Sequence, residues 1–161
     1  MKSLVVVQSI HHLNTRQVGE VIGHVLDADV RSPDSLSPDE LAAYDLIGFG
    51  SGIYFATFHF SLTGLIKRAK AAYPRQRVFI FSTSGLPFLS RLYHYPLKKR
   101  LARAGFDVVG EFHCRGHDSF GPLWFLGGLN RHHPNEHDLA QAEAFAKGLL
   151  TSESPPTADR R

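Results

Sequence analysis

The sequence predicts a three-layer α/β protein in which helices cover both faces of a five-stranded parallel sheet. Short apolar runs alternate strictly with segments whose apolar residues recur at helical spacing. The runs are rich in Val, Ile and Phe and lack the alternation of apolar and polar residues that marks a half-exposed strand. Such runs are typical of parallel strands that are buried on both faces of a sheet.

Length and composition agree with one globular domain. The chain has 161 residues, of which 43% are hydrophobic and 20% are charged. We expect the domain to span residues 1–150, and residues 151–161, with two prolines and no apolar anchor, to form a disordered tail. The apolar runs are much shorter than the roughly 18 residues of a membrane span, and no cleavable apolar segment precedes the first run. A soluble, cytoplasmic protein is therefore expected.

Cysteine content excludes a disulfide-stabilised domain, and the charge distribution argues against a nucleic-acid-binding protein. The single cysteine, Cys114, cannot form an intramolecular disulfide. The formal net charge is +3, but the basic residues are spread along the chain, and the densest group is Lys98, Lys99 and Arg100 with Arg103. A short basic run of this kind is typical of a solvated helix face, so no nucleic-acid partner is expected.

The first strand and helix lie at the start of the chain, and a polar loop joins them. Residues 4–7 predict a strand, and the apolar spacing over residues 18–26 predicts a helix. The loop contains Ser9, Asn14 and Thr15. The first turn of a helix offers unpartnered N–H groups and partial positive charge, which suit a phosphate. Alternatively, Asn14 or Thr15 is only the N-cap of the helix.

The middle of the chain predicts two further strands. Residues 28–30 are a short strand candidate, residues 37–41 form a capped helical turn, and residues 45–50 form a clearer strand. Residues 51–56 then form a glycine-rich loop, which indicates a sharp turn or the close approach of another group. The apolar spacing that follows predicts a helix over residues 62–72.

Two more strand–helix units complete the pattern. Residues 77–81 predict a buried strand that runs into a polar loop, residues 82–85. Leu89, Leu92, Leu97, Leu101 and Ala104 predict the apolar face of the next helix, and Pro96 is expected to cap or kink its start. The last strand covers residues 106–112, and the last helix starts at residue 134. The segment between them, residues 114–134, has no periodicity and is long enough to be functional.

The three polar loops, residues 9–15, 51–56 and 82–85, each follow the carboxyl end of a predicted strand. In an open parallel sheet these ends meet at one edge, which is where such folds bind ligands. Three separate helix caps would have no reason to share the same Gly, Ser, Thr and Asn chemistry. The pattern therefore favours a ligand site at this edge.

These loops resemble those of the flavodoxin family in its short-chain, five-stranded form, over about residues 3–150. Residues 9–15 are similar to the hydroxyl-rich loop that ends in Gly-Asn-Thr and wraps the phosphate of FMN, with Leu13 where the family usually has glycine. Residues 45–54 and 81–85 are similar to the strands and loops on the two sides of the isoalloxazine ring. The resemblance implies the strand order 2-1-3-4-5 and FMN as the cofactor.

The resemblance also implies a set of FMN-binding residues, to which the aromatic residues of the loops are added. They are Ser9, Ile10, His11, His12, Leu13, Asn14, Thr15, Ser51, Gly52, Ile53, Tyr54, Phe55, Ser82, Thr83, Ser84, Gly85, Phe120 and Gly121. Residues 120–121 belong to the long segment after the last strand, which we expect to lie over the flavin edge. For each aromatic residue, simple packing against the core is the alternative.

The expected function is that of an FMN-binding redox protein, either an electron-transfer protein or an FMN-dependent NAD(P)H oxidoreductase. Its partner would be a redox protein or a small-molecule electron acceptor. Carrier flavodoxins are typically strongly acidic, whereas this chain is net positive, which favours a local, specific partner. The alternative is a flavodoxin-fold protein without flavin that acts as a protein-interaction module. No metal site is expected, because His113 and His117 are accompanied by one cysteine only.

Overall fold

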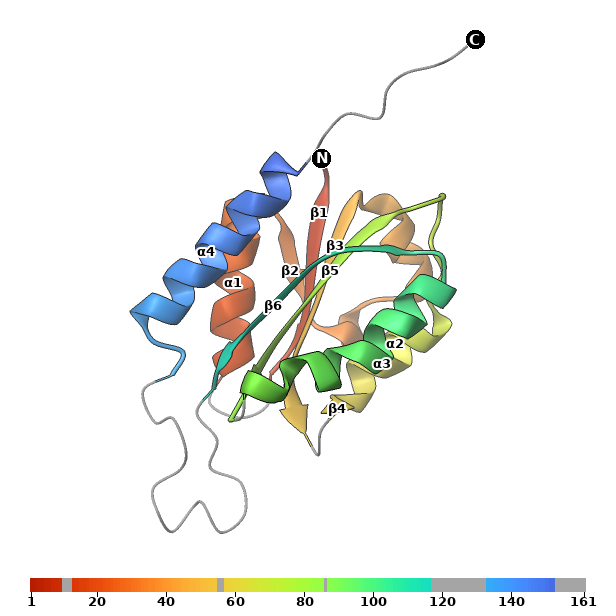
Figure 1. The fold of residues 1–161 in the computed structure, drawn as a ribbon. Helices are drawn as coiled ribbons and strands as arrows, with labels where there is room; N and C mark the ends of the chain where they lie inside the picture. Colours follow the sequence, from red (N-terminus) through yellow and green to blue (C-terminus); the bar gives the residue numbers. More distant parts are fainter. Residues whose placement is uncertain (10–12, 55–56, 86, 117–132, 153–161) are drawn as a thin grey trace.

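Six strands form the sheet of this protein, whose structure is a computed structural model that describes residues 1–9, 13–54, 57–85, 87–116 and 133–152 (Figure 1). Five of the strands are parallel and run in the order β2-β1-β3-β5-β6, and the short strand β4 pairs with the end of β3 in antiparallel fashion. Leaving β4 aside, this is the predicted order. The strands are β1 (Ser3–Gln8), β2 (Asp29–Arg31), β3 (Leu46–Tyr54), β4 (Thr57–Phe58), β5 (Arg77–Ser84) and β6 (Asp107–Arg115).

Helices cover both faces of the sheet, as predicted (Figure 1). On one face α1 (Asn14–Leu26) lies against α4 (Glu136–Thr151), and on the other α2 (Phe60–Arg68) lies beside α3 (Ser90–Arg103). Short 3-10 helices occupy the connections; they are η1 (Pro33–Ser35), η2 (Pro38–Ala43) and η3 (Pro87–Leu89). Within the described residues, no helix combines the length and the apolar character needed to cross a membrane.

The sheet separates two apolar cores. Alternate residues of each strand face opposite helical layers, so that in β5 Phe79 and Phe81 belong to the α1–α4 core and Ile80 to the α2–α3 core. The two phenylalanine rings lie over Gly48 and Gly50 of β3. A Cβ atom at Gly48 would lie 2.3 Å from Phe79 Cζ, and one at Gly50 would lie 2.0 Å from Phe81 Cζ. The rings therefore occupy the space in which side chains at these glycines would stand.

Two predicted loops are partly strand. Residues 51–54 continue β3 and residues 82–84 continue β5, because the two strands stay paired as far as Gly52 and Thr83. The last strand likewise runs on to Arg115. The polar residues of these segments consequently alternate between the two faces of the sheet.

The second helix ends earlier than predicted. It stops at Arg68, whereas the apolar spacing predicted a helix as far as residue 72. Other hydrogen bonds replace the next helical ones: Ala71 N donates to the distant Ala104 O, and Ala72 N donates to the side chain of the nearby, fully buried Gln76. Tertiary hydrogen bonding therefore decides where α2 ends.

The third helix differs from its prediction in two ways. Pro96 lies inside α3 instead of at its start. The buried residues of the helix are Ser90, His94, Leu97 and Leu101, while Leu92, which was predicted to face the core, is 66% exposed. Pro96 has no N–H to donate to the carbonyl of Leu92, so α3 lacks one helical hydrogen bond at this exposed turn.

Candidate functional site

The start of α1 and the end of β5 meet at the carboxyl edge of the sheet. Thr15 Oγ1 and Thr83 Oγ1 lie 2.8 Å apart and share a hydrogen bond, although the residues are 68 positions apart in the sequence. Both side chains are buried, as is that of the neighbouring Asn14. The structure therefore brings two of the three predicted polar loops together through their side chains.

The end of β6 closes against the same point. Gly116 N donates a hydrogen bond to Ser84 O at 3.1 Å. A Cβ atom on Gly116 would lie 3.0 Å from Thr83 Cβ and 3.2 Å from Asn14 Nδ2. Because glycine has no side chain, the β6 backbone can approach both residues closely.

Helix α1 begins at this junction without a side-chain cap. Its N-cap residue is Leu13, which has the left-handed backbone angles φ 54° and ψ 20°, and the first turn contains no acidic residue. Asn14 and Thr15 are the first two residues of the helix, so neither is the N-cap. By contrast, α4 carries a capping box made by Asn135 and Asp138. No acidic side chain in the first turn of α1 neutralises the partial positive charge at the start of the helix, and such a helix start suits an anion.

Ser51 and Ser82 point to the other face of the sheet. Ser51 Oγ accepts a hydrogen bond from His59 N at 3.1 Å and donates to Gly52 O at 2.6 Å. Ser82 Oγ lies 2.7 Å from His94 Nε2. Both hydroxyl groups are buried and form hydrogen bonds within the chain. They therefore support the ends of β3 and β5 without facing the start of α1.

A polar network that the sequence interpretation missed continues from Ser82. His94 Nδ1 lies 3.1 Å from Glu111 Oε2, and Lys98 Nζ binds the other carboxylate oxygen. Burial lowers the pKa of His94 and outweighs the hydrogen bond to Glu111, which acts to raise it. A neutral His94 that donates from Nδ1 to the carboxylate accepts from the Ser82 hydroxyl at Nε2. Burial acts to raise the pKa of Glu111, but hydrogen bonds from Lys98 and His94 hold it below its usual value.

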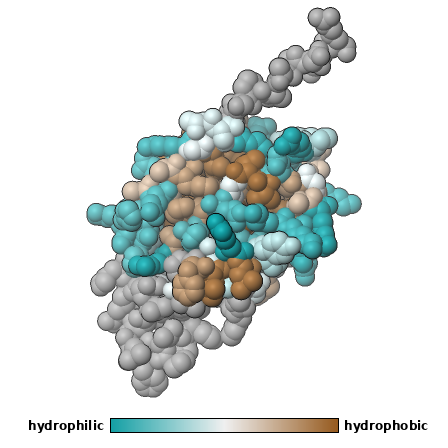
Figure 2. Space-filling view, in the orientation of Figure 1, coloured by the Kyte–Doolittle hydropathy of each residue, from teal (hydrophilic) through white to brown (hydrophobic). Residues whose placement is uncertain are grey.

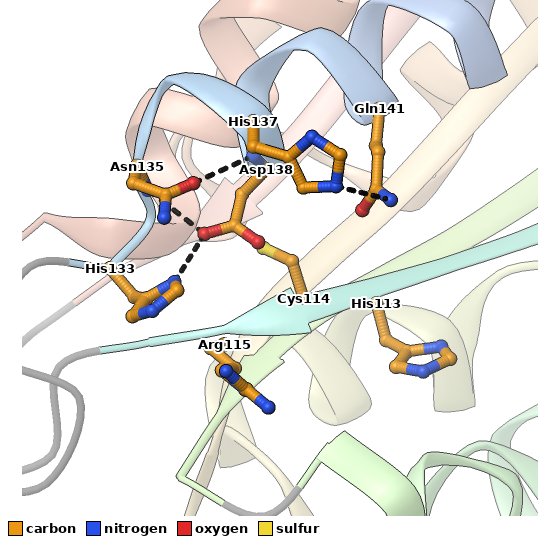
Figure 3. Close-up of a pocket in the computed structure, with 8 residues that line it drawn as sticks. All are labelled: His113, Cys114, Arg115, His133, Asn135, His137, Asp138 and Gln141. Carbon is orange, nitrogen blue, oxygen red and sulfur yellow. Dashed lines mark hydrogen bonds and ion pairs between the residues drawn. The ribbon is translucent and has the colours of Figure 1, made fainter.

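A polar cavity of about 500 Å³ lies beside the end of β6 and the start of α4 (Figure 3). In it His133 Nδ1 lies 2.5 Å from Asp138 Oδ2, which also accepts from Asn135 N at 2.9 Å. The Cys114 side chain points toward Asp138 from β6 (Figure 3). Burial, with a smaller contribution from the Asp138 carboxylate, raises the pKa of Cys114 to about 12, so the thiol is protonated at neutral pH. No set of three or more metal-ligating side chains gathers in the part of the chain that the structure describes.

Comparison with known proteins gives one strong relationship in sequence. A scan against protein-family models finds no match. The uncharacterized protein MJ0298 of Methanocaldococcus jannaschii is 44% identical over 150 residues, which cover 93% of this chain and 99% of the archaeal protein. The chain belongs to the same family as this archaeal protein.

The fold is flavodoxin-like. Oxidised flavodoxin 2 from Bacillus cereus superimposes with a TM-score of 0.70 at 18% identity, covering 94% of this chain and 99% of that one. A short-chain flavodoxin associated with a non-canonical PDU bacterial microcompartment gives a TM-score of 0.69 at 12% identity, covering 96% of this chain and 100% of that one. A flavodoxin from the domain Archaea gives 0.63 at 16% identity, with 94% and 97% covered.

The remaining predicted residues of this flavodoxin-like protein are distributed as follows. Ser9, Ile53, Ser84 and Gly85 are half-buried at or just beyond the carboxyl ends of β1, β3 and β5. The backbone of Tyr54 belongs to β3 and pairs with Thr57 of β4. Six predicted residues lie outside the described part of the chain; these are Ile10, His11, His12, Phe55, Phe120 and Gly121.

Proposed function

We propose that this protein binds FMN at the carboxyl edge of its sheet and functions in electron transfer or as an oxidoreductase. One observation carries the proposal. In a flavodoxin-like fold, the uncapped start of α1 is joined to the end of β5 by the Thr15–Thr83 hydrogen bond. This is the edge of an open α/β sheet at which ligands bind.

The residues at this junction fit a phosphate group. The first turn of α1 has backbone N–H groups that no side chain of the helix caps, and it has no acidic residue that would repel a dianion. Asn14 and Thr15 are the first two residues of the helix. Because Gly116 has no side chain, the backbone of the residue 116 region can lie close to the Asn14 side chain. In the proposed function, Asn14, Thr15 and the N–H groups of this turn hold the phosphate.

The strand ends supply the walls of the ring site. When bound, FMN supplies one- and two-electron redox chemistry, and the polypeptide supplies binding and orientation. The ends of β3 and β5 lie side by side, paired through Gly52 and Thr83. Beneath them Ser51 and Ser82 are fixed by hydrogen bonds to His59 and His94. The described part of this edge is thus held by strand pairing and side-chain hydrogen bonds before a ligand binds, which lowers the cost of ordering these residues on binding.

Titration of the apo-protein with FMN, followed by quenching of FMN fluorescence, tests the proposal. We expect saturable binding at micromolar concentrations or below, and much weaker binding of riboflavin, because each charge-assisted hydrogen bond to phosphate contributes about 1.5–3 kcal/mol. Asn14→Ala should weaken FMN binding by roughly tenfold or more and leave riboflavin binding nearly unchanged. Thr63→Ala on α2 is the matched control, and it should have no effect on either ligand.

Two results would count against this function. The absence of quenching would leave the alternative of a flavodoxin-fold interaction module without flavin. Equal affinities for FMN and riboflavin would show that the start of α1 does not recognise phosphate.

A further inference from the structure

The charged residues of the helices are divided between the two faces of the sheet. Helices α2 and α3 together contain seven basic residues and no acidic residue; the basic residues are Lys67, Arg68, Arg91, Lys98, Lys99, Arg100 and Arg103. Helices α1 and α4, on the opposite face, contain two basic and four acidic residues; these are Arg16 and Lys147, and Glu20, Glu136, Asp138 and Glu143. Among the four helices, the positive charge is therefore concentrated on the α2–α3 layer.

Exposed apolar side chains lie on the same layer. Phe88, Leu92 and Tyr95 are 76%, 66% and 63% exposed, and Phe60 at the start of α2 is 78% exposed. Figure 2 shows a hydrophobic patch over the first turns of α3, with hydrophilic side chains above it. An apolar centre with a charged rim is the usual composition of a protein-docking surface.

A groove between α2 and α3 continues this surface. It has a volume of about 230 Å³ and is lined by Phe58 and Leu97, with Lys67 and Arg100 also among its lining residues. Phe58 and Leu97 are buried. Within the described residues neither Lys67 nor Arg100 forms an ion pair, whereas Lys98 is paired with Glu111. Two cations are thus available to carboxylates from another molecule.

We propose that the α2–α3 surface, made of Phe88, Leu92, Tyr95, Lys67, Lys99 and Arg100, docks an acidic protein partner. Opposite charge selects such a partner, because carboxylates would meet unpaired cations beside a desolvated apolar centre. The helix that carries most of this surface starts shortly after the end of β5, so the surface adjoins the proposed flavin edge. The role of this partner as a redox partner rests on the proposed function, but docking itself does not require FMN.

This surface differs from a nucleic-acid site in composition. Aliphatic and aromatic residues at its centre suit the apolar anchors of a protein, and its cations come from both helices, Lys67 from α2 and Lys99 and Arg100 from α3. Complementary charge mainly increases the rate of association and is screened by salt over a Debye length of about 8 Å at 0.15 M. Binding should therefore weaken as salt rises and persist in part through the apolar centre.

A small acidic [2Fe–2S] ferredoxin serves as the probe. Its binding to the full chain is measured by fluorescence anisotropy at low and at physiological salt, both with and without added FMN. We expect saturable binding in both states, at least about tenfold weaker for Arg100→Glu and for Lys99→Glu. Leu92→Ala should weaken it at physiological salt. The control Lys147→Glu changes the net charge by the same amount on α4 and should shift affinity by less than about twofold.

Three results would overturn the proposal. They are no saturable binding of ferredoxin, equal losses for Arg100→Glu and Lys147→Glu, and tighter binding of duplex DNA that Arg100→Glu abolishes. Ferredoxin binding is also measured without FMN, so it tests docking alone. A failure of the proposed function would appear instead in the FMN titration.

Discussion

His94 Nε2 lies 2.7 Å from Ser82 Oγ, and both side chains are only 1% exposed. This contact joins the middle of α3 to the end of β5, directly below the proposed ring site. Glu111 holds the other imidazole nitrogen, so the ring has a partner at each nitrogen. A buried polar network stabilises a fold only when its polar atoms have hydrogen-bond partners, and both ring nitrogens of His94 have one.

Stability should depend on pH through His94. Burial lowers the pKa of His94 in the folded state, so the unfolded chain binds more protons below the ordinary histidine value near 6.5. The contribution of His94 is therefore fully present above about pH 6.5 and is lost as the pH falls through the lower, folded-state pKa. Urea unfolding of the wild type and of His94→Gln between pH 5 and 8 should show a steeper acid loss for the wild type.

The other groups that face His94 are Glu111 and His113 of β6 and Lys98 of α3. The pKa of His113 is also lowered by burial, so it acts in the same direction, while Glu111 titrates below this pH range. His24→Gln, at an exposed position on α1, is the control. Parallel pH profiles for the wild type and His94→Gln would contradict the prediction.

The hydrogen bond between Thr15 and Thr83 should appear in a double-mutant cycle. Thr15→Val or Thr83→Val alone leaves one buried hydroxyl without this partner, and each should lower the free energy of unfolding by about 1–3 kcal/mol. The double variant should lose less than the sum of the two, with a coupling of at least about 0.5 kcal/mol. Additive losses in denaturant unfolding would show that the two hydroxyls do not interact.

Gly116 should tolerate alanine poorly. The added Cβ would stand 3.0 Å from Thr83 Cβ, so Gly116→Ala should lower the free energy of unfolding by about 1–3 kcal/mol and weaken FMN binding. Gly148→Ala is the matched control, because nothing lies within 4 Å of the added atom and the residue is in α4. The free energy of unfolding of Gly148→Ala should rise by about 0.5–1 kcal/mol. Similar effects of the two changes, measured by urea unfolding, would contradict the proposed close approach.

The thiol of Cys114 should be unreactive in the folded protein. With its pKa raised to about 12 by burial, only a minute fraction is thiolate at pH 8, and the side chain is 4% exposed. Labelling with a chromogenic disulfide reagent should be slow in buffer and complete at once in concentrated guanidinium. Rapid labelling of the native protein would show that the β6–α4 contact opens readily.

Sequence patterns predicted the fold because strand and helix signals are local. Leu4 to Val7, and Val78 to Phe81, are apolar runs of the right length, and their order along the chain implies a parallel sheet. The convergence of Thr15 and Thr83 also followed from this topology, since Thr83 lies at the carboxyl end of β5 and Thr15 lies in the first turn of the helix that follows the carboxyl end of β1. Their direct hydrogen bond is a detail of geometry that spacing does not contain.

The buried face of α3 was predicted only in part, because burial was judged from hydrophobicity alone; Leu97 and Leu101 are buried as predicted. Leu92 satisfied an apolar pattern, yet Ser90 and His94 are buried in its place. His94 is accommodated because Ser82 and Glu111, 12 and 17 residues away, supply its partners. The spacing of positions 90, 94, 97 and 101 was visible in the sequence, but nothing local distinguished it from the competing leucine pattern.

The two phenylalanine–glycine pairs of the central strands constrain how this family can diverge. An alanine at Gly50 would place its Cβ 2.0 Å from the Phe81 ring, and one at Gly48 would meet the Phe79 ring at 2.3 Å. A larger residue at either glycine is compatible with the packing only when the facing phenylalanine becomes smaller. Homologous sequences should therefore change at positions 48 and 79 together, and at positions 50 and 81 together. Such paired changes in homologous sequences would show that the ring-to-backbone contact is kept under selection, whether or not a homologue retains the flavin site.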